Sequence, residues 1–214
     1  MAIFDLVPSP STLSMELQAN TALFPSPLVA SQQILDRGGL KWLATYNFTN
    51  VSADKRAILM GLLARVRGQA NRLRVPVYDN PKRGAYGGTP LVNGASQTGS
   101  VLAIDGCSNN ITDWITAGDY FSVVVNGEHE LKMCTQDNSS NGTGQIATLE
   151  FEPRLRASPL NNAIIRVEDG VLPKPVGIFT LVGQTAGWSS RPFQTSSELS
   201  QVVLNLMEDV FATQ

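Results

Sequence analysis

The second half of the sequence is dominated by short β-type segments that are separated by turn-forming residues. From Ser100 onward, apolar and β-branched residues form candidate strands over residues 100–105, 119–126, 129–136, 145–152, 162–168 and 176–183. The connecting segments contain Asn126-Gly127, Asn141-Gly142-Thr143-Gly144 and Asp169-Gly170. Because Asn-Gly between two apolar runs favours a tight turn, residues 119–136 are predicted to form a hairpin. This pattern predicts a mainly β protein, either a β-sandwich or a barrel.

One amphipathic segment interrupts the β pattern. Ser52 is a suitable N-cap, and Asp54 follows at the positive end of the helix dipole. Gly68 is a natural C-terminal stop. The residues that recur at helical spacing are Ile58, Leu59, Leu62, Leu63 and Val66. The sequence therefore predicts one α-helix over residues 53–67, between candidate strands at 40–48 and 73–78.

Proline and glycine divide the rest of the chain. Four prolines exclude a long helix from residues 1–40, which we expect to form an extended arm with short strands lying across a neighbouring domain or subunit. The glycine-rich residues 79–97 are predicted to be a long loop. Residues 196–212 fit a helix and a strand almost equally, and we favour a strand.

These boundaries suggest three parts. Residues 1–40 form the arm, and residues 41–184 form a β-rich core with one helix, which allows two small β subdomains split near residue 98. Residues 185–214 are expected to close the β domain or to contact neighbouring subunits.

Composition excludes several classes of protein. With 43% hydrophobic and 16% charged residues, the 214-residue chain is typical of a folded protein rather than a disordered one. Its net charge of −2 does not favour sequence-specific nucleic-acid binding. Basic residues do gather between Lys55 and Arg83, and Tyr78 and Tyr86 interleave with this basic run. The run consists of Lys55, Arg56, Arg65, Arg67, Arg72, Arg74, Lys82 and Arg83. Such a run can follow a nucleic-acid backbone, but a solvated helix face with subunit ion pairs is the simpler interpretation.

The N-terminal sequence and the cysteines indicate the compartment. The segment MAIFDLVPSPST lacks the basic start and the apolar run of a signal peptide, and no stretch of the chain is apolar enough to span a membrane. We therefore expect the protein to be made and folded in a cytoplasm. Two cysteines could form one disulfide, but Cys107 and Cys134 are predicted to be free, buried thiols of a reducing compartment. His129 is the only histidine, so the ligands of a structural zinc site are too few.

Two loops resemble ligand-binding motifs without completing them. The run Gly84-Ala85-Tyr86-Gly87-Gly88 resembles a phosphate loop, but Thr89 and Pro90 follow it where lysine and serine or threonine are needed. The run Asp137-x-Ser139-x-Asn141-Gly142 resembles the start of a calcium loop, but Thr148 occupies the position of the bidentate glutamate. We interpret it as a polar connector, with a weak calcium site left open.

No residue pattern predicts a catalytic site. The segment Gly94–Gly99 misses the spacing of a nucleophile elbow around Ser96. A serine hydrolase would also need His129, which we expect to be a solvated strand residue beside Glu128 and Glu130. Carboxylates available for glycoside cleavage are Asp105, Asp113, Asp119, Glu150 and Glu152. Since sequence gives no distances between them, we assign no catalytic, cofactor-binding or metal-binding residue and expect no enzyme activity.

Five segments taken in order resemble a known family. They are Leu62–Arg72, Asp79–Gly84, Gly94–Gly99, Ala117–Phe121 and Leu149–Arg156. This order, covering roughly residues 40–170, resembles phage tail proteins of long-tailed, siphovirus-like phages that are akin to distal tail proteins.

The resemblance implies a structural role in a virion. Such proteins form a ring, often of six subunits, that joins the tail tube to the tail-tip hub and the receptor-binding fibres. The expected partners are therefore copies of the chain itself, the tail tube protein, and the hub and fibre proteins, at the tail tip of a phage whose proteins are made in the bacterial cytoplasm. Three alternatives remain open: another tail ring such as tube or adaptor, a carbohydrate-binding module using Trp114 and Trp188, and a glycan hydrolase.

Overall fold

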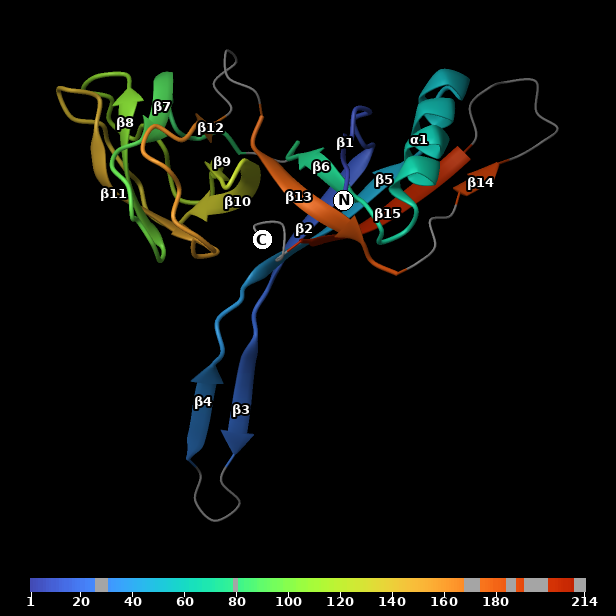
Figure 1. Cartoon of the computed structure of the whole chain (residues 1–214), viewed down its shortest axis with the longest axis horizontal. Helices are drawn as coiled ribbons and strands as arrows, with labels where there is room; N and C mark the ends of the chain where they lie inside the picture. Colours follow the sequence, from blue (N-terminus) through green and yellow to red (C-terminus); the bar gives the residue numbers. More distant parts are fainter. Residues whose placement is uncertain (26–30, 79–80, 168–173, 184–187, 191–199, 210–214) are drawn as a thin grey trace.

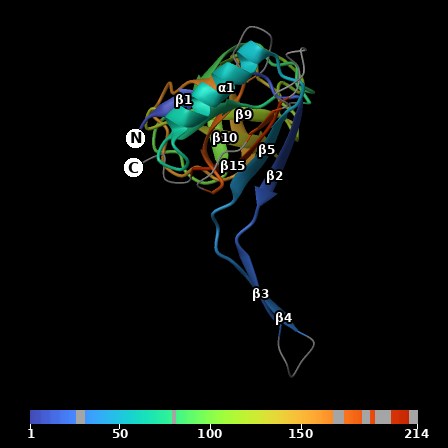
Figure 2. The ribbon, with the colours of Figure 1, turned by 90° about the vertical axis from the view of Figure 1, so that its right-hand side faces the viewer.

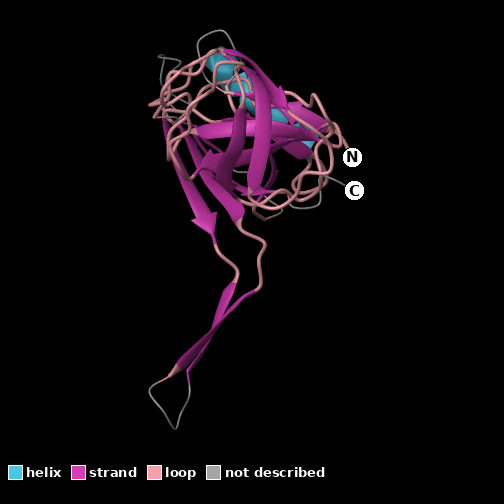
Figure 3. Ribbon diagram, turned by 90° about the vertical axis from the view of Figure 1, so that its left-hand side faces the viewer, coloured by secondary structure: helices cyan, strands magenta, loops and turns pink. Residues whose placement is uncertain are grey.

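The protein consists of a β-barrel beside a larger β-sheet, with a hairpin that projects from the sheet (Figure 1). The structure, a computed structural model, describes residues 1–25, 31–78, 81–167, 174–183, 188–190 and 200–209. Figure 3 shows that strands are the main regular structure of these residues and that α1 (Ala53–Val66) is helical. The prediction of a mainly β protein with one well-defined helix is confirmed.

The larger sheet contains seven of the described strands. Its members are β1 (Ile3–Asp5), β6 (Arg72–Pro76), β13 (Val176–Leu181), β15 (Ser200–Glu208), β5 (Lys41–Phe48) and β2 (Thr12–Gln18) in spatial order, with β14 (Trp188–Ser190) paired to β15. The pairs are antiparallel except for β1 with β6. Strand β15 lies within residues 196–212, so the favoured strand is confirmed for the residues described there.

Helix α1 covers one face of this sheet, and its ends follow the sequence signals. The Ser52 hydroxyl accepts a hydrogen bond from the Lys55 backbone N–H at 3.5 Å. The left-handed Arg67 closes the last turn by donating its N–H to the Leu63 carbonyl at 3.2 Å. The side chains that pack into the core are Leu59, Leu62, Leu63 and Val66. The inclusion of Ile58 in this stripe was wrong. It is 52% exposed, because a residue adjacent to Leu59 is turned about 100° away around the helix.

The second sheet forms a nearly closed barrel. Its spatial order is β12 (Ile165–Arg166), β9 (Tyr120–Val125), β10 (Glu128–Cys134), β11 (Ile146–Glu152), β8 (Val101–Cys107) and β7 (Gly88–Val92). The first and last strands meet where the Val92 N–H donates to the Ala163 carbonyl at 3.0 Å and the Asn162 N–H donates to the Val92 carbonyl at 2.8 Å. Strands β9 and β10 form the predicted hairpin around Asn126-Gly127.

Strand β7 corrects the prediction that residues 79–97 form only a loop. Gly88 has a φ of 85°, and the pairing of β7 with β8 shifts register between Gly88 and Leu91. Glycine and proline usually indicate a turn, but an irregular strand at the end of a sheet tolerates both. Pro90 therefore lies within a strand here.

Only part of the predicted N-terminal arm leaves the body of the protein. Strands β1 and β2 belong to the main sheet, and Leu6 between them is 1% exposed. The projecting part contains β3 (Thr21–Pro25) and β4 (Gln32–Asp36), which extend away from the ends of β2 and β5 (Figure 2). The turn predicted at residues 169–170 lies outside the described residues, as do residues 79–80 at the start of the predicted loop.

Candidate functional site

The projecting hairpin carries large apolar side chains in the solvent. Leu23, Phe24, Ile34 and Leu35 are 54%, 50%, 69% and 48% exposed, and we call these four residues the hairpin surface. Leu23 lies opposite Ile34, while Phe24 lies opposite Gln33 and Leu35 opposite Ala22. Because neighbouring residues of a strand point to opposite faces, both faces of the hairpin are apolar. An isolated two-stranded hairpin is marginally stable in water, so this pattern is typical of a segment that packs against another molecule.

The hairpin continues a two-stranded ribbon that is anchored in the body. Strand β2 pairs with β5 without a break from Thr12↔Asn47 to Gln18↔Lys41. Gly38 and Gly39, with φ values of 65° and 78°, then lead the chain between β4 and β5. These left-handed conformations strongly favour glycine, which explains the Gly-Gly pair at this bend.

The main sheet also leaves an edge and a face uncovered among the described residues. Strand β2 ends the sheet, contains no proline or register shift, and has Glu16 as its only charged residue. Such an edge lacks the usual features that prevent pairing with another strand. On the face opposite α1, a shallow groove is lined in part by Leu43, Thr45, Val182, Asn205 and Met207. The edge, the groove and the hairpin surface form one extended region available for protein contacts.

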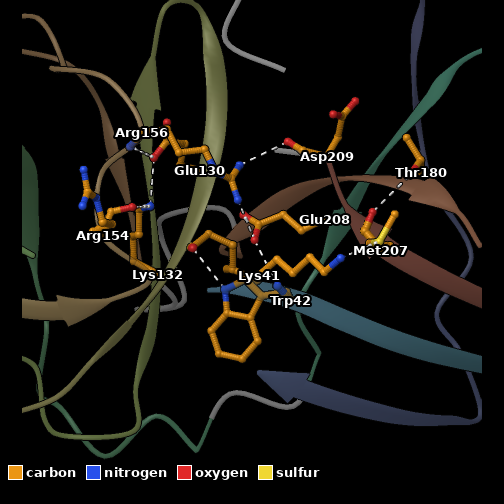
Figure 4. Close-up of polar contacts among 11 residues, drawn as sticks. Lys41, Trp42, Glu130, Lys132, Arg154, Arg156, Thr180, Met207, Glu208 and Asp209 are labelled. Carbon is orange, nitrogen blue, oxygen red and sulfur yellow. Dashed lines mark hydrogen bonds and ion pairs between the residues drawn. The ribbon is translucent and has the colours of Figure 1, made fainter. Parts of the chain in front are cut away.

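A buried polar network fixes the barrel against the main sheet (Figure 4). The indole N–H of Trp42 in β5 donates to the Leu131 carbonyl in β10 at 3.2 Å. Arg156 of the barrel pairs with Glu208 of β15 at 2.8 Å, and it also donates to the Asp209 carbonyl at 3.1 Å. Since these contacts join the two sheets directly, we interpret the network as the device that holds their relative orientation.

The same network contains a second ion pair inside the barrel. Lys132 is fully buried, and its Nζ lies 2.8 Å from Glu130 Oε2 while donating to the Arg154 carbonyl at 2.9 Å. Burial lowers the pKa of Lys132, although the nearby Glu130 opposes that shift. Burial raises the pKa of Glu208 more than Arg156 and the Trp42 N–H lower it. Each buried charge thus has a partner, as burial of charge requires.

The glycine-rich run at Gly84–Gly88 uses its backbone to hold an internal carboxylate. The N–H groups of Arg83 and Gly84 donate to the fully buried Asp119 at 3.0 and 2.9 Å, and the Thr116 N–H donates to it at 3.0 Å. Burial raises the pKa of Asp119, but the hydrogen bonds together lower it by more. The pKa therefore lies below the ordinary value. Asp119 therefore occupies the position near this loop that an external phosphate would need.

The oxygens of the segment resembling a calcium loop already accept hydrogen bonds. Asp137 Oδ1 accepts from the Ala117 N–H at 2.9 Å, and Ser139 Oγ accepts from the Asp113 N–H at 3.0 Å. Asn141 Oδ1 accepts from the Thr143 and Gln145 N–H groups, each at 2.9 Å. The arrangement is that of a polar connector. Across the described residues, His, Cys, Asp and Glu side chains gather nowhere in a group of three that could hold a metal ion.

The expectation that His129 is solvated was wrong. It is 8% exposed, and its burial, followed by the positive charges of Arg166 and Arg74, lowers its pKa to about 4. The alternation of exposed and buried residues fails here because β10 is buried on both faces, between the barrel core and the main sheet. Ser96, the candidate nucleophile, is exposed in an irregular segment. The side chain of Gln97 holds this segment, because its Oε1 accepts from the Ala103 N–H and its Nε2 donates to the Ala103 carbonyl.

The candidate carboxylates have separate surroundings. Asp119 is the internal acceptor described above, and Asp113 is exposed whereas Asp105 is partly buried. Glu150 accepts from Gln136 Nε2 at 2.6 Å, and Glu152 accepts from the Ser100 hydroxyl at 3.0 Å.

Several basic side chains of the run contact acidic or aromatic residues of the same chain. Arg72 pairs with Asp209, Arg74 pairs with Asp5 at 3.2 Å, and the Arg65 guanidinium lies 4.3 Å from the centre of the Phe4 ring. Lys55 and Arg67 are exposed.

The two tryptophans proposed for glycan binding do not share an exposed face. Trp114 is fully buried, and its indole N–H donates to the Gly87 carbonyl at 2.9 Å, so it cannot stack on a sugar. The side chain of Trp188 lies outside what the structure describes. Cys107 and Cys134 are free and buried, as predicted.

No family model matches the chain, and no curated protein sequence is significantly similar to it. Among the residues that the structure describes, no helix is long and apolar enough to cross a membrane.

The sequence pattern did not predict the hairpin surface, because residues 1–40 have the proline content of a single extended arm. The signal is present in the sequence as two short segments with apolar residues, Thr21–Pro25 and Gln32–Asp36, which lie on either side of Pro27.

Proposed function

We propose that this chain is a structural subunit of a phage tail, forming a distal tail ring that joins the tail tube to the tail-tip hub and the receptor-binding fibres. The hairpin surface carries this proposal, because four large apolar side chains on a projecting ribbon are stabilised only when another molecule covers them. The choice of a distal tail protein follows from the order of sequence segments between residues 40 and 170, which resembles that family.

The shape of the contact region supports association of several copies rather than a symmetric pair. The hairpin surface lies on a projection, whereas the groove beside Leu43 and Met207 lies on the body of the sheet. Two different surfaces that engage one another give head-to-tail contacts, and such contacts produce a closed ring when the rotation closes. We therefore propose that each chain contacts neighbouring copies of itself within the ring. The tube protein on one side and the hub and fibre proteins on the other are its further partners.

No residue is assigned a catalytic role in this proposal. The polar groups with unusual environments, Asp119, Lys132 and Glu208, hold loops and the junction together. Another tail ring, such as tube or adaptor, would use the same hairpin, and the position of the ring in the particle distinguishes these assignments.

The experiment measures the native mass of the purified chain with and without the hairpin surface. The double variant Phe24→Thr/Ile34→Thr removes one large apolar side chain from each strand while keeping β-forming residues. Leu160→Thr is the matched control, since Leu160 is 75% exposed but lies outside the hairpin. We expect the wild-type chain and the control to assemble into rings of about six subunits, alone or with tube protein, and the double variant to stay monomeric.

The variants must remain folded for this result to be meaningful. Exposed substitutions usually change stability by about 0.5 kcal/mol or less, so all three proteins should unfold at similar temperatures. A wild-type chain that neither associates with itself nor joins tail proteins contradicts the proposal, as does a double variant that assembles normally.

A further inference from the structure

A cleft lies between the barrel and the main sheet on one side of their junction. The main sheet contributes Asp5 of β1, Arg74 of β6 and Val176 of β13 to its lining, and the barrel contributes Arg166 of β12. Figure 1 shows β12 on the side of the barrel nearest β13. The two walls of the cleft therefore belong to different sheets, and a movement of the barrel away from the sheet would widen it.

One hydrogen bond joins the two sheets at the edge of this cleft. The backbone N–H of Val176 in β13 donates to the hydroxyl of Ser122 in β9 at 3.3 Å. Its acceptor thus belongs to the barrel rather than to a neighbouring strand of its own sheet. This N–H stays protected from solvent only while the barrel remains in place against the sheet.

His129 of β10 lies where a proton would meet positive charge from both sheets. Its side chain is 8% exposed, and the positive charges of Arg166 from the barrel and Arg74 from the main sheet both act on it. Its Nδ1 atom is buried without a hydrogen-bond partner among the residues that the structure describes, so a proton bound there would find no acceptor. The closed cleft therefore disfavours the imidazolium form.

The carboxylate of the cleft offsets only part of this positive charge. Asp5 lies 3.2 Å from Arg74 and also acts favourably on Arg166, so one carboxylate faces two arginines. Lys174 lies 5.2 Å from the centre of the Tyr78 ring at the cleft wall, and the argument does not depend on its charge. Protonation of His129 would place a third cation beside the two arginines and the single carboxylate.

The elements packed against β10 bring no further carboxylate to the imidazole. Glu128 and Glu130 adjoin His129 in the strand, and neighbouring residues of a strand point to opposite faces. Glu130 is paired with Lys132 at 2.8 Å. In β9, Val124 lies opposite His129, and β13 contains no charged residue.

We propose that this cluster is an acid-sensitive latch, in which protonation of His129 beside Arg74 and Arg166 drives the barrel away from β13 and opens the cleft. The opening brings the imidazolium into water and separates Val176 from Ser122, while each sheet keeps its own hydrogen-bond ladder. The latch is a property of the single chain, so it goes beyond the proposed function and does not rest on it.

The sign and size of the effect follow from the two states of His129. Its pKa is about 4 in the closed cleft, whereas a solvated imidazole has the ordinary value of 6.5. The open state binds the proton more tightly, so the ratio of open to closed molecules should rise about 100-fold between pH 7 and pH 4. Glu208 at the junction opposes this trend, because burial raises its pKa. The test therefore compares variants that all retain Glu208.

Hydrogen exchange of single backbone amides measures the opening, with each rate divided by the intrinsic rate at that pH. Val176 reports the cleft. The reference amides are Cys134, which donates to the Asp119 carbonyl within the barrel, and Asp209, which donates to the Ile178 carbonyl within the main sheet. We expect the protection of Val176 to fall about 100-fold relative to both references between pH 7 and pH 4.

His129→Gln should abolish this fall, because glutamine does not titrate and the chain has no other histidine. If glutamine loosens the junction at both pH values, Arg166→Gln is the second test. It keeps the imidazole but removes one repelling charge, so it should reduce the fall by about threefold or more. Lys55→Gln is its matched control, since it removes an exposed charge from α1, which does not line the cleft.

Three results would overturn the latch. The first is an equal loss of protection at all three amides, which would mean that acid unfolds the whole chain instead of opening the cleft. The second is a fall at Val176 that persists in His129→Gln. The third is a fall in Arg166→Gln as large as that in Lys55→Gln.

Discussion

Replacing Arg156 with alanine should destabilise the protein strongly, because it leaves a buried carboxylate without its cation. Arg156 pairs with Glu208 at 2.8 Å, and the two side chains are 12% and 2% exposed. The substitution also removes the hydrogen bond to the Asp209 carbonyl at 3.1 Å. Breaking a buried ion pair by removing one partner typically costs about 3–5 kcal/mol. For a chain of this length that corresponds to a fall in Tm of about 6–20 °C.

Chemical denaturation of the wild type, Arg156→Ala and Arg154→Ala measures this effect. Arg154 is the matched control, because its exposed side chain lies two residues before Arg156 in the same loop. Its carbonyl, which accepts from Lys132, is retained in the variant. We expect Arg154→Ala to change the free energy of unfolding by about 0.5 kcal/mol or less. Equal losses in the two variants would refute the role given to the junction network.

The pH dependence provides a further check on the same pair. The pKa of Glu208 is raised by burial even with Arg156 present, and removing Arg156 raises it further. A carboxyl with a raised pKa binds its proton more tightly in the folded state, so its contribution to stability falls as pH rises above the ordinary pKa. The loss caused by Arg156→Ala should therefore be larger at pH 7 than near pH 4, and Arg156→Ala/Glu208→Gln should recover part of it.

Three further predictions concern single residues. The pKa of His129 is about 4 in the folded state, whereas its ordinary value in the unfolded chain is 6.5. This difference contributes about 3 kcal/mol of stability at neutral pH, which is lost as the pH falls from the unfolded pKa through the folded one. An NMR titration should give the low pKa directly, and a pKa near 6.5 would contradict the burial of this side chain. Asp119→Ala should cost about 3 kcal/mol or more in urea unfolding, because it leaves the N–H groups of Arg83, Gly84 and Thr116 without their acceptor, and a neutral effect would argue against that clamp. Gly144→Ala should lower the Tm by several degrees, since its φ is 71° and an added Cβ would meet the Cys107 carbonyl; an unchanged Tm would show that this turn is less constrained.

Local sequence signals were sufficient where the structure depends on neighbouring residues. Ser52 and the spacing of Leu59, Leu62 and Val66 specify α1, and Asn126-Gly127 specifies the β9–β10 hairpin. These features follow from capping and turn geometry, which a short stretch of chain determines by itself.

The remaining features depend on what packs against each segment. His129 stands between two glutamates and so has the sequence of a solvated strand, but β10 is covered on both sides. Gly88 and Pro90 usually indicate a turn, but here they lie in β7 because that segment pairs with β8. The junction network combines residues from distant parts of the chain, such as Trp42 with Leu131 and Arg156 with Glu208. No local pattern contains such long-range pairings.

The most direct measurement of the central claim is an image of the intact phage particle at residue resolution. Our account predicts a ring of identical chains at the end of the tail tube, in which Leu23, Phe24, Ile34 and Leu35 of each copy are buried against a neighbouring chain. Particles that lack this protein, or a ring whose hairpins project into solvent with those four side chains uncovered, would contradict it.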